Sequence, residues 1–168
     1  KGLLDAYVAV KTPKRLSYTD STRTPIITGR IVAFLHRDNL KNDRFSKVAD
    51  IQDLQGFHIG SLNGNGWVAR NLAGMDIRKV VSMRALAKML LKKRVDFVPE
   101  NMHIMQYYLA QVDPQQHITY QKLDIPDIEL HFLMSKTSHY LDLLPQIDGI
   151  LKRMQASGEI EKIYAKYR

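Results

Sequence analysis

The first stretch that could carry chemistry is GSLNGNGW, residues 60–67, which lies between the apolar run FHI and the helix-like run WVARNLAGM. Its GNGWVA portion matches the G-x-G-x-x-[GA] fingerprint of dinucleotide sites. However, no Asp or Glu occurs from Val80 to Val95, where the ribose-binding acid belongs. The Gly-Lys-Ser/Thr ending of a phosphate-binding P-loop is absent as well, so both nucleotide interpretations lack their second requirement.

A simpler ligand suits the physics of this loop. Glycines let backbone N–H groups at a helix N-terminus face an incoming group, and these donors together with the helix dipole favour an anion such as a carboxylate. Asn63 and Asn65 add side-chain hydrogen bonding, and Trp67 can supply an apolar wall. A tight strand-to-helix turn that binds nothing explains the same residues, so the chemistry of the loop leaves both alternatives open.

Arg15 is a second candidate, because it stands in the motif TPKR just after a predicted strand. Its fork of N–H donors matches the two oxygens of a carboxylate. In the same motif Thr12 can cap a short helix that has Pro13 at its first position. Position alone, however, favours a surface arginine on a turn.

The patterns of metal binding and catalysis are missing from the sequence. The six histidines include no pair with metal-ligand spacing on one helix, and neither H-E-x-x-H nor G-x-S-x-G occurs. Asp96 and Glu100 could be imagined as paired carboxylates, but so short a strand rarely aims two of them at one substrate bond. We therefore expect no catalytic residue, no metal and no cofactor.

The composition is globular, with 45% hydrophobic and 25% charged residues among 168. No apolar run approaches the roughly 20 residues of a membrane-spanning helix. The absence of cysteine excludes disulfides, thiolate metal sites and a cysteine nucleophile. Although the net charge is +8, the basic residues are spread along the chain, and the densest cluster, residues 92–94, ends an amphipathic helix. We expect no nucleic-acid partner.

Strands and helices alternate along the sequence, and the elements between them position the candidate residues. Strands are predicted at residues 3–10, 26–36, 57–61, 78–82, 95–99, 118–123 and 128–135, and helices at 48–56, 65–73, 83–94, 100–112 and from 138 onward. This order predicts an α/β fold with mainly parallel sheets covered by helices, in which ligands bind beyond the carboxyl ends of the strands. The polar stretch 37–47 is the best candidate for a boundary between two lobes.

With these pieces in order, the chain resembles the type II periplasmic solute-binding proteins, specifically family 3, the amino-acid-binding type of ABC transporters. GLLDAYVAVKTPKR resembles the G-x-x-D-A strand and T-x-x-R turn of that family, and LQGFHIGSLNGNGW resembles its L-x-G-x-x-[IV]-G strand and glycine loop. MLLKKRVDFVPEN is similar to its leucine-rich helix and following strand. The C-terminal stretch, MSKTSHYLDLLPQIDGILKRMQASGEIEKIYAKY, is similar to the C-terminal pattern of that family. Each piece is unspecific alone, but their order covers nearly the whole chain.

The resemblance implies a periplasmic binding protein-like type II fold, with two α/β lobes joined by crossing strands and a ligand trapped as the lobes close. It places the tail of lobe one and the first crossing strand in residues 1–37, lobe two in 38–123, and the return strand with the C-terminal helices in 124–168. Family members begin with a further strand and helices, so we expect the first lobe to be incomplete. The expected state is a monomer or a swapped dimer, since an incomplete lobe would expose apolar sheet surface that favours swapping or pairing between chains.

The resemblance also assigns residues to a ligand site. Arg15 matches the arginine that holds the α-carboxylate of the ligand, and Thr12 is the threonine of the same motif. The loop formed by Asn63, Gly64, Asn65, Gly66 and Trp67 matches the lobe-two loop whose backbone donors meet that carboxylate.

The acidic position that takes the α-ammonium falls on Glu100 or Asn101. The sequence departs from the family pattern at two places. Val8 and Val10 replace the hydroxyl residues common before the turn, and Asn65 followed by Gly66 replaces the expected Thr or Ser.

The function expected from this resemblance is a non-enzymatic, extracytoplasmic bacterial receptor. It would capture a small carboxylate-bearing solute, an amino acid by preference, through hinge closure and deliver it to the membrane subunits of an ABC transporter. Two alternatives share the fold: a ligand-sensing domain in signalling, and a catalytic relative such as a dehydratase or a cell-wall lyase module, for which Glu100 is the candidate acid or base. Fold alone does not decide among them.

Overall fold

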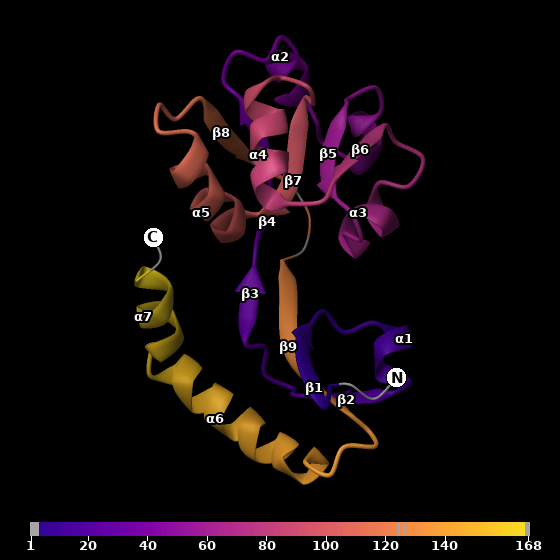
Figure 1. The fold of residues 1–168 in the computed structure, drawn as a ribbon, viewed down its shortest axis with the longest axis vertical. Coiled ribbons are helices and arrows are strands. Elements are labelled where there is room, and N and C mark those ends of the chain that lie inside the picture. Colours follow the sequence, from indigo (N-terminus) through magenta and orange to yellow (C-terminus); the bar gives the residue numbers. More distant parts are fainter. Residues whose placement is uncertain (1–3, 124, 126, 167–168) are drawn as a thin grey trace. The chain divides into compact units, whose positions relative to one another are not determined.

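A computed structural model describes residues 4–123, 125 and 127–166 of the chain (Figure 1). The chain forms two compact units: unit 1 comprises residues 1–29 and 127–168, and unit 2 comprises residues 30–126. The predicted strand at 3–10 begins at Leu3, the predicted third segment begins at Asp124, and the terminal motif includes Tyr167; these three residues lie outside the described part. Each unit is described separately below.

Unit 1 is built on an antiparallel sheet with β9 (Ile128–Ser135) at its centre. Strand β1 (Ala6–Ala9) pairs with one side of β9, with Val8 opposite Phe132. Strands β2 (Thr19–Ser21) and β3 (Ile27–Gly29) also pair with β9. Strand β2 is not among the strands predicted from the sequence, because its pairing partner is more than a hundred residues away.

The helices of unit 1 follow local signals in the sequence, although the helix predicted from residue 138 onward begins at Leu144. Thr12 caps the short helix α1 (Pro13–Leu16), and its side chain accepts the N–H of Arg15 at 3.2 Å. After the 3-10 turn η2 (Leu141–Leu143), the C-terminal segment forms α6 (Leu144–Ala156) and α7 (Glu159–Ala165). Gly158 separates them with a φ of +68°, a left-handed conformation that suits glycine. The C-terminal helical segment is therefore divided in two at this glycine.

Unit 2 contains a five-stranded sheet in the order β6-β5-β7-β4-β8. Its strands are β4 (Ile31–His36), β5 (Ile59–Leu62), β6 (Ile77–Val80), β7 (Phe97–Asn101) and β8 (Ile118–Lys122). Strand β5 runs parallel to β6 and β7, whereas β4 runs antiparallel to β7 and β8.

The predicted α/β fold class is confirmed, and parallel pairing occurs in unit 2, where β5 pairs with β6 and β7. Antiparallel strands add to it. Ile31, at the start of β4, pairs with Asn101, at the end of β7. The chain enters unit 2 at this edge of the sheet, so β4 must run opposite to the parallel strands that end there. Strand β9 has antiparallel partners throughout the described part of unit 1.

The strands of unit 2 send alternate side chains to two apolar clusters, as the period of two along a strand requires. Val32 and Phe34 of β4 face a cluster covered by α4 (Met83–Leu91) and α5 (Met102–Val112), the helices drawn in front of the sheet in Figure 1. Ala33 and Leu35 face a second cluster covered by α2 (Asn42–Phe45), η1 (Ile51–Leu54) and α3 (Gly66–Asn71). Both clusters position the ends of β5 and β7, where the candidate residues lie.

Candidate functional site

The glycine loop contains three glycines with three different structural roles. Gly60 lies inside β5, where an added Cβ would approach Val98 Cγ2 to 2.9 Å and Leu86 Cδ1 to 3.0 Å. Gly64 makes the turn with a φ of +77° in open space. Gly66 is the first residue of α3. Gly60 therefore serves the packing of α4 on the sheet, and the candidate binding segment is confined to residues 63–67.

Asn65 is the N-cap of α3. Its side chain accepts two of the backbone N–H groups that were expected to face a ligand. Asn65 Oδ1 accepts the backbone N–H of Trp67 at 3.1 Å and that of Val68 at 3.2 Å. Trp67 is half-buried and packs against the second apolar cluster. The capped turn is thus stable without a ligand, and Asn63, which is exposed, remains a polar side chain directed to solvent.

Arg15 lies on α1, next to the carboxyl end of β1. Its Nη1 donates a hydrogen bond of 2.7 Å to the carbonyl of Val10, which fixes the guanidinium beside the strand end. Within the described residues, no carboxylate lies within ion-pair distance of it. Half-buried and without such a counter-ion, Arg15 retains donors that can bind an anionic group.

Two tyrosines lie near Arg15, and neither is among the site residues predicted from the sequence. The hydroxyls of Tyr7 and Tyr18 lie 3.2 Å apart. Burial and the hydrogen bond with Tyr18 raise the pKa of Tyr7, and the nearby Arg15 guanidinium opposes this shift. The pair therefore adds two hydroxyls and two aromatic rings to the surroundings of Arg15.

Glu100 is the buried carboxyl of unit 2. It lies on β7, only 9% exposed, and its Oε1 accepts the backbone N–H of Asn101 at 2.8 Å. Burial raises the pKa of Glu100, and this hydrogen bond offsets part of the rise. A buried carboxylate with one hydrogen bond is a group that a ligand cation would stabilise.

Asn101 has a structural role that is established by its contacts. Its Oδ1 accepts the N–H groups of His103 at 3.0 Å and Ile104 at 3.2 Å, so it caps α5. Residues 100 and 101 end β7, whereas the sequence analysis placed them in the helix that follows. That prediction is wrong because β7 continues its pairing with β4 to Asn101.

In unit 2 the loop and Glu100 lie at the same edge of the sheet. Strands β5 and β7 are parallel, with Ile59 opposite Phe97, so their carboxyl ends lie at one edge. Residues 63–67 follow the first of these ends, and Glu100 lies on the second. Ile31 pairs with Asn101 at this edge, so it is also where the chain enters unit 2.

In unit 1 the α1 turn follows the corresponding end of the sheet. Strand β1 runs antiparallel to β9, with Ala9 opposite His131. Its carboxyl end therefore points toward the start of β9, where the chain enters unit 1 for the second time. In unit 1, Arg15 follows the carboxyl end of β1; in unit 2, residues 63–67 follow β5 and Glu100 lies near the end of β7.

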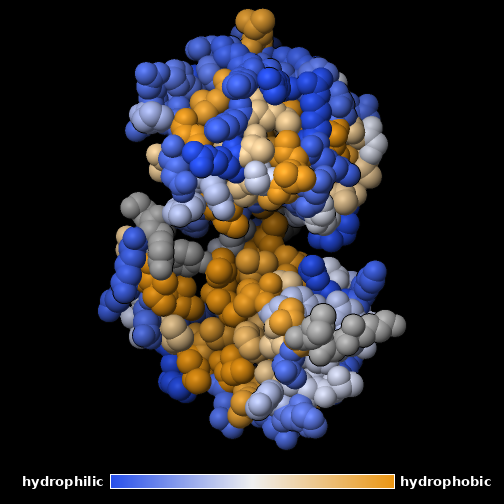
Figure 2. Space-filling view, in the orientation of Figure 1, coloured by the Kyte–Doolittle hydropathy of each residue, from blue (hydrophilic) through white to orange (hydrophobic). Residues whose placement is uncertain are grey.

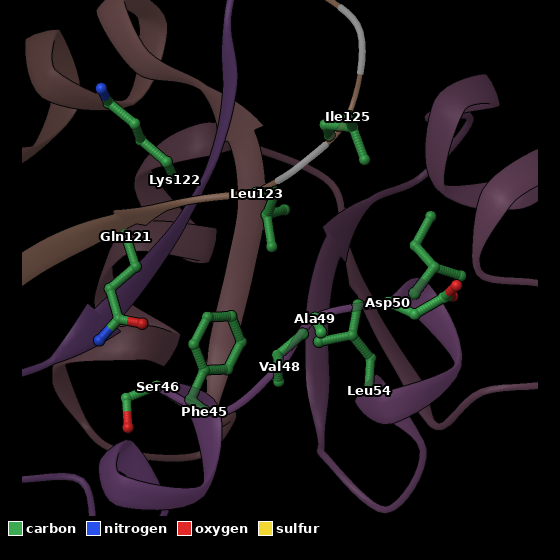
Figure 3. Close-up of a pocket in the computed structure, with 11 residues that line it drawn as sticks. Phe45, Ser46, Val48, Ala49, Asp50, Leu54, Gln121, Lys122, Leu123 and Ile125 are labelled. Atoms are coloured by element: carbon green, nitrogen blue, oxygen red, sulfur yellow. The ribbon is translucent and has the colours of Figure 1, made fainter.

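One pocket of unit 2 lies away from these residues. It has a volume of about 100 Å³ and is lined by α2, η1 and the end of β8 (Figure 3), with Phe45, Leu54 and Gln121 among its residues. None of the predicted site residues lines it. Across the described ranges, no three His, Asp or Glu side chains are arranged to hold a metal ion. No helix of the described part combines the length and apolar character needed to cross a bilayer.

Solved structures share this fold. The GluR0 ligand-binding core in complex with L-glutamate is 18% identical, has a TM-score of 0.79, and matches over 99% of this chain and 73% of that one. A histidine kinase sensor domain with similarity to periplasmic binding proteins is 18% identical and has a TM-score of 0.75. The match covers 99% of this chain and 70% of that one. A third structure is AbpA from Streptococcus pneumoniae Canada MDR_19A, an amino acid ABC transporter substrate-binding protein bound to L-arginine. It is 18% identical, has a TM-score of 0.73, and matches over 95% of this chain and 65% of that one.

These likenesses establish the fold. No protein-family model matches the sequence, and no curated protein matches it either. The chain spans about two thirds to three quarters of the length of the three structures named above. It has the fold of the type II periplasmic solute-binding proteins of the amino-acid type, as the resemblance in its sequence implied.

Proposed function

We propose that the chain is a receptor that binds a small carboxylate-bearing solute, with amino acids as the class of ligand. The observation that carries this proposal is Arg15, a half-buried guanidinium held at the end of β1 by the carbonyl of Val10. Its free donors suit the two oxygens of a carboxylate, and the hydroxyls of Tyr7 and Tyr18 add hydrogen-bonding capacity beside it.

The second half of the proposed site is in unit 2. The buried carboxyl of Glu100 would hold the α-ammonium of an amino acid, since a cation removes the cost of an unpaired buried charge. Asn63 and the exposed glycines of residues 63–67 would approach the ligand carboxylate. Thr12, Asn65, Trp67 and Asn101 would act indirectly, because the contacts described above use them as helix caps or in packing.

Hinge closure is the proposed mode of capture. A ligand that contacts residues of both units stabilises the closed state by the difference between its affinities for the closed and open states. Delivery to the membrane subunits of an ABC transporter, on the outer side of a bacterial membrane, completes the proposal. It is supported by the likeness to an amino acid ABC transporter substrate-binding protein.

A sensing domain in signalling is the second candidate, since a histidine kinase sensor domain has the same fold. Both candidates bind a solute without transforming it, so a ligand screen tests what they share. A catalytic relative would instead use Glu100 as an acid or base. Consumption of a bound ligand would reveal such an activity.

The testing experiment is a thermal-melt screen of the chain against amino acids and small organic acids. A ligand at 100 times its dissociation constant adds about 2.7 kcal/mol of stability, which corresponds to a rise of about 5–10 °C in Tm. We expect a rise for at least one amino acid, its loss in Arg15→Ala, and its retention in Lys14→Ala, the matched control on the same helix. No rise with any amino acid would refute the amino-acid class.

A further inference from the structure

One face of unit 2 concentrates positive charge. Residues 77–95, which span β6, α4 and the residues that follow α4, contain seven of the 25 Lys and Arg residues of the chain and no Asp or Glu. Helix α5 covers the same face of the sheet and contains no Asp, Glu, Lys or Arg. Figure 2 shows this face of unit 2, where hydrophilic side chains surround smaller hydrophobic areas. The two covering helices therefore supply cations without a carboxylate of their own.

The cations of α4 form a row on its outer side. Four apolar residues of α4 are buried against the sheet. Residues four apart share one side of a helix, so the exposed side chains of Arg84, Lys88 and Lys92 follow one another along the opposite side. Arg78 of β6 joins the end of this row, because its Nη1 donates a hydrogen bond of 2.7 Å to the carbonyl of Arg94. The basic face of α4, defined in this way, consists of Arg78, Arg84, Lys88, Lys92 and Arg94, all exposed.

The basic face has no counter-ion among the described residues. No carboxylate of that part of the chain lies within 4.0 Å of a nitrogen of its five side chains. Asp76 and Asp96, which flank the stretch in sequence, contact His58 and Lys41 instead. Lys93 is not part of the basic face, because an aspartate carboxylate lies 3.6 Å from its Nζ.

The row works against the stability of α4 itself. The helix dipole favours cations at the end of α4, where Lys92 and Arg94 stand, but disfavours Arg84 in the first turn. Like charges four residues apart on a helix repel, and Arg84, Lys88 and Lys92 form two such pairs. Helix stability therefore does not account for the row, whereas an external anionic surface does.

We propose that the basic face of α4 binds the surface of an anionic phospholipid bilayer. Clustered Lys and Arg residues on an amphipathic helix attract anionic headgroups, and each cation near the surface adds to the affinity. Exposed Ile104 and Tyr107 on α5 suit the boundary between headgroups and acyl chains. A protein partner fits less well, because charged residues are depleted from the core of protein interfaces and α4 presents one at every turn. None of these residues belongs to the proposed ligand site, so the two proposals are independent.

Sedimentation of the 168-residue chain with lipid vesicles tests this proposal. We expect binding to phosphatidylcholine vesicles that contain about 30% phosphatidylglycerol, no binding to phosphatidylcholine alone, and loss of binding in about 0.5 M salt. Lys88→Glu places an anion in the middle of the row, so it should raise the dissociation constant for the vesicles roughly tenfold or more. Lys152→Glu is the matched control, because it makes the same change of charge at an exposed lysine on α6 and should have little effect.

Two further measurements separate binding from folding. Lys88→Glu gives Arg84 and Lys92 a neighbour of opposite charge, so this variant should melt no lower than the wild type. In the wild type, anionic vesicles should protect Lys88 and Lys92 from acetylation and leave Lys152 as reactive as in solution. A chain that does not bind the anionic vesicles overturns the proposal, and so does a chain that Lys88→Glu weakens no more than Lys152→Glu. Tighter binding of poly-glutamate or duplex DNA at the same salt also overturns it, because the face would then suit an acidic protein or a nucleic acid.

Discussion

Glu100 shows at the scale of a single residue how a proposed binding role conflicts with stability. Burial raises the pKa of its carboxyl, so the folded state binds the proton more tightly than the unfolded state. Its contribution to stability is present below the unfolded pKa and is lost as pH rises through the higher folded pKa. At neutral pH the ionised side chain therefore costs stability in a chain without ligand.

Glu100→Gln should remove this cost and keep the hydrogen bond from the N–H of Asn101, since the amide oxygen can accept it. We expect the variant to be more stable than the wild type at pH 8 by about 1 kcal/mol, or about 2–4 °C in Tm, and the difference to shrink toward pH 4. Melts followed by the fluorescence of Trp67, the single tryptophan, measure it.

The same variant should bind an amino-acid ligand more weakly, because the carboxylate for the ammonium group is gone. A pH-independent stability difference would contradict the account of Glu100 as a buried ionisable group. Unchanged affinity would contradict its place in the binding site.

The cap Thr12 and the position of Arg15 could be anticipated from the sequence because one short motif places them, whereas Asn65 was expected to bond a ligand and instead caps α3. A helix cap or a strand-end arginine depends on neighbours within a few residues, such as Thr12 and Pro13. Tyr7 and Tyr18 could not be anticipated in the same way. Their hydroxyls meet only because β1 and the turn after α1 bring residues eleven positions apart to one place.

At the scale of elements, local patterns predicted the helices well and failed where pairing decides the structure. The helix predicted at 83–94 is present as α4, and Ser82 caps it, because its side chain accepts the N–H of Ala85 at 3.2 Å. Strand β2, in contrast, is short and polar, and β9 holds it in place. The same tertiary pairing extends β7 to Asn101, where local composition indicated a helix.

The contact between β5 and α4 gives a prediction for the glycine loop. Gly60→Ala would force a methyl group against Val98 and Leu86, so we expect a loss of about 1–3 kcal/mol in the unfolding free energy of unit 2. Gly66→Ala is the control, since its nearest neighbour is the flexible end of Arg70 at 3.2 Å. That variant should stay within about 0.5 kcal/mol of the wild type.

Urea unfolding followed by Trp67 fluorescence measures both variants. Equal midpoints for Gly60→Ala and Gly66→Ala would mean that α4 can move away from β5, and that Gly60 has no special packing role. A loss in the Gly60 variant alone would support the separation of the structural glycine from the candidate binding segment at residues 63–67.

At the scale of the whole molecule, the two units differ in how much apolar surface each buries by itself. Unit 2 has two core clusters, one on each face of its sheet. Unit 1 has an apolar sheet face with little cover and an unprotected strand edge.

This difference predicts unequal local stability. In a sample dilute enough to be monomeric, amides of β4 and β7 should exchange at least about 100-fold more slowly than those of β1 and β3, because core strands open only with the whole unit. Hydrogen exchange followed by mass spectrometry resolves these segments. Equal protection of the two units in the monomer would show that unit 1 has a sufficient core of its own.

The central claim is that Arg15 holds the carboxylate of an amino-acid ligand, and a calorimetric cycle tests it most directly. The amino acid that raises Tm most and its carboxamide are each titrated into the wild type and Arg15→Ala. We predict that the wild type binds the carboxamide roughly 10- to 150-fold more weakly than the acid, while Arg15→Ala binds both with similar low affinity. If Arg15→Ala discriminates between acid and carboxamide as strongly as the wild type, the claim is wrong.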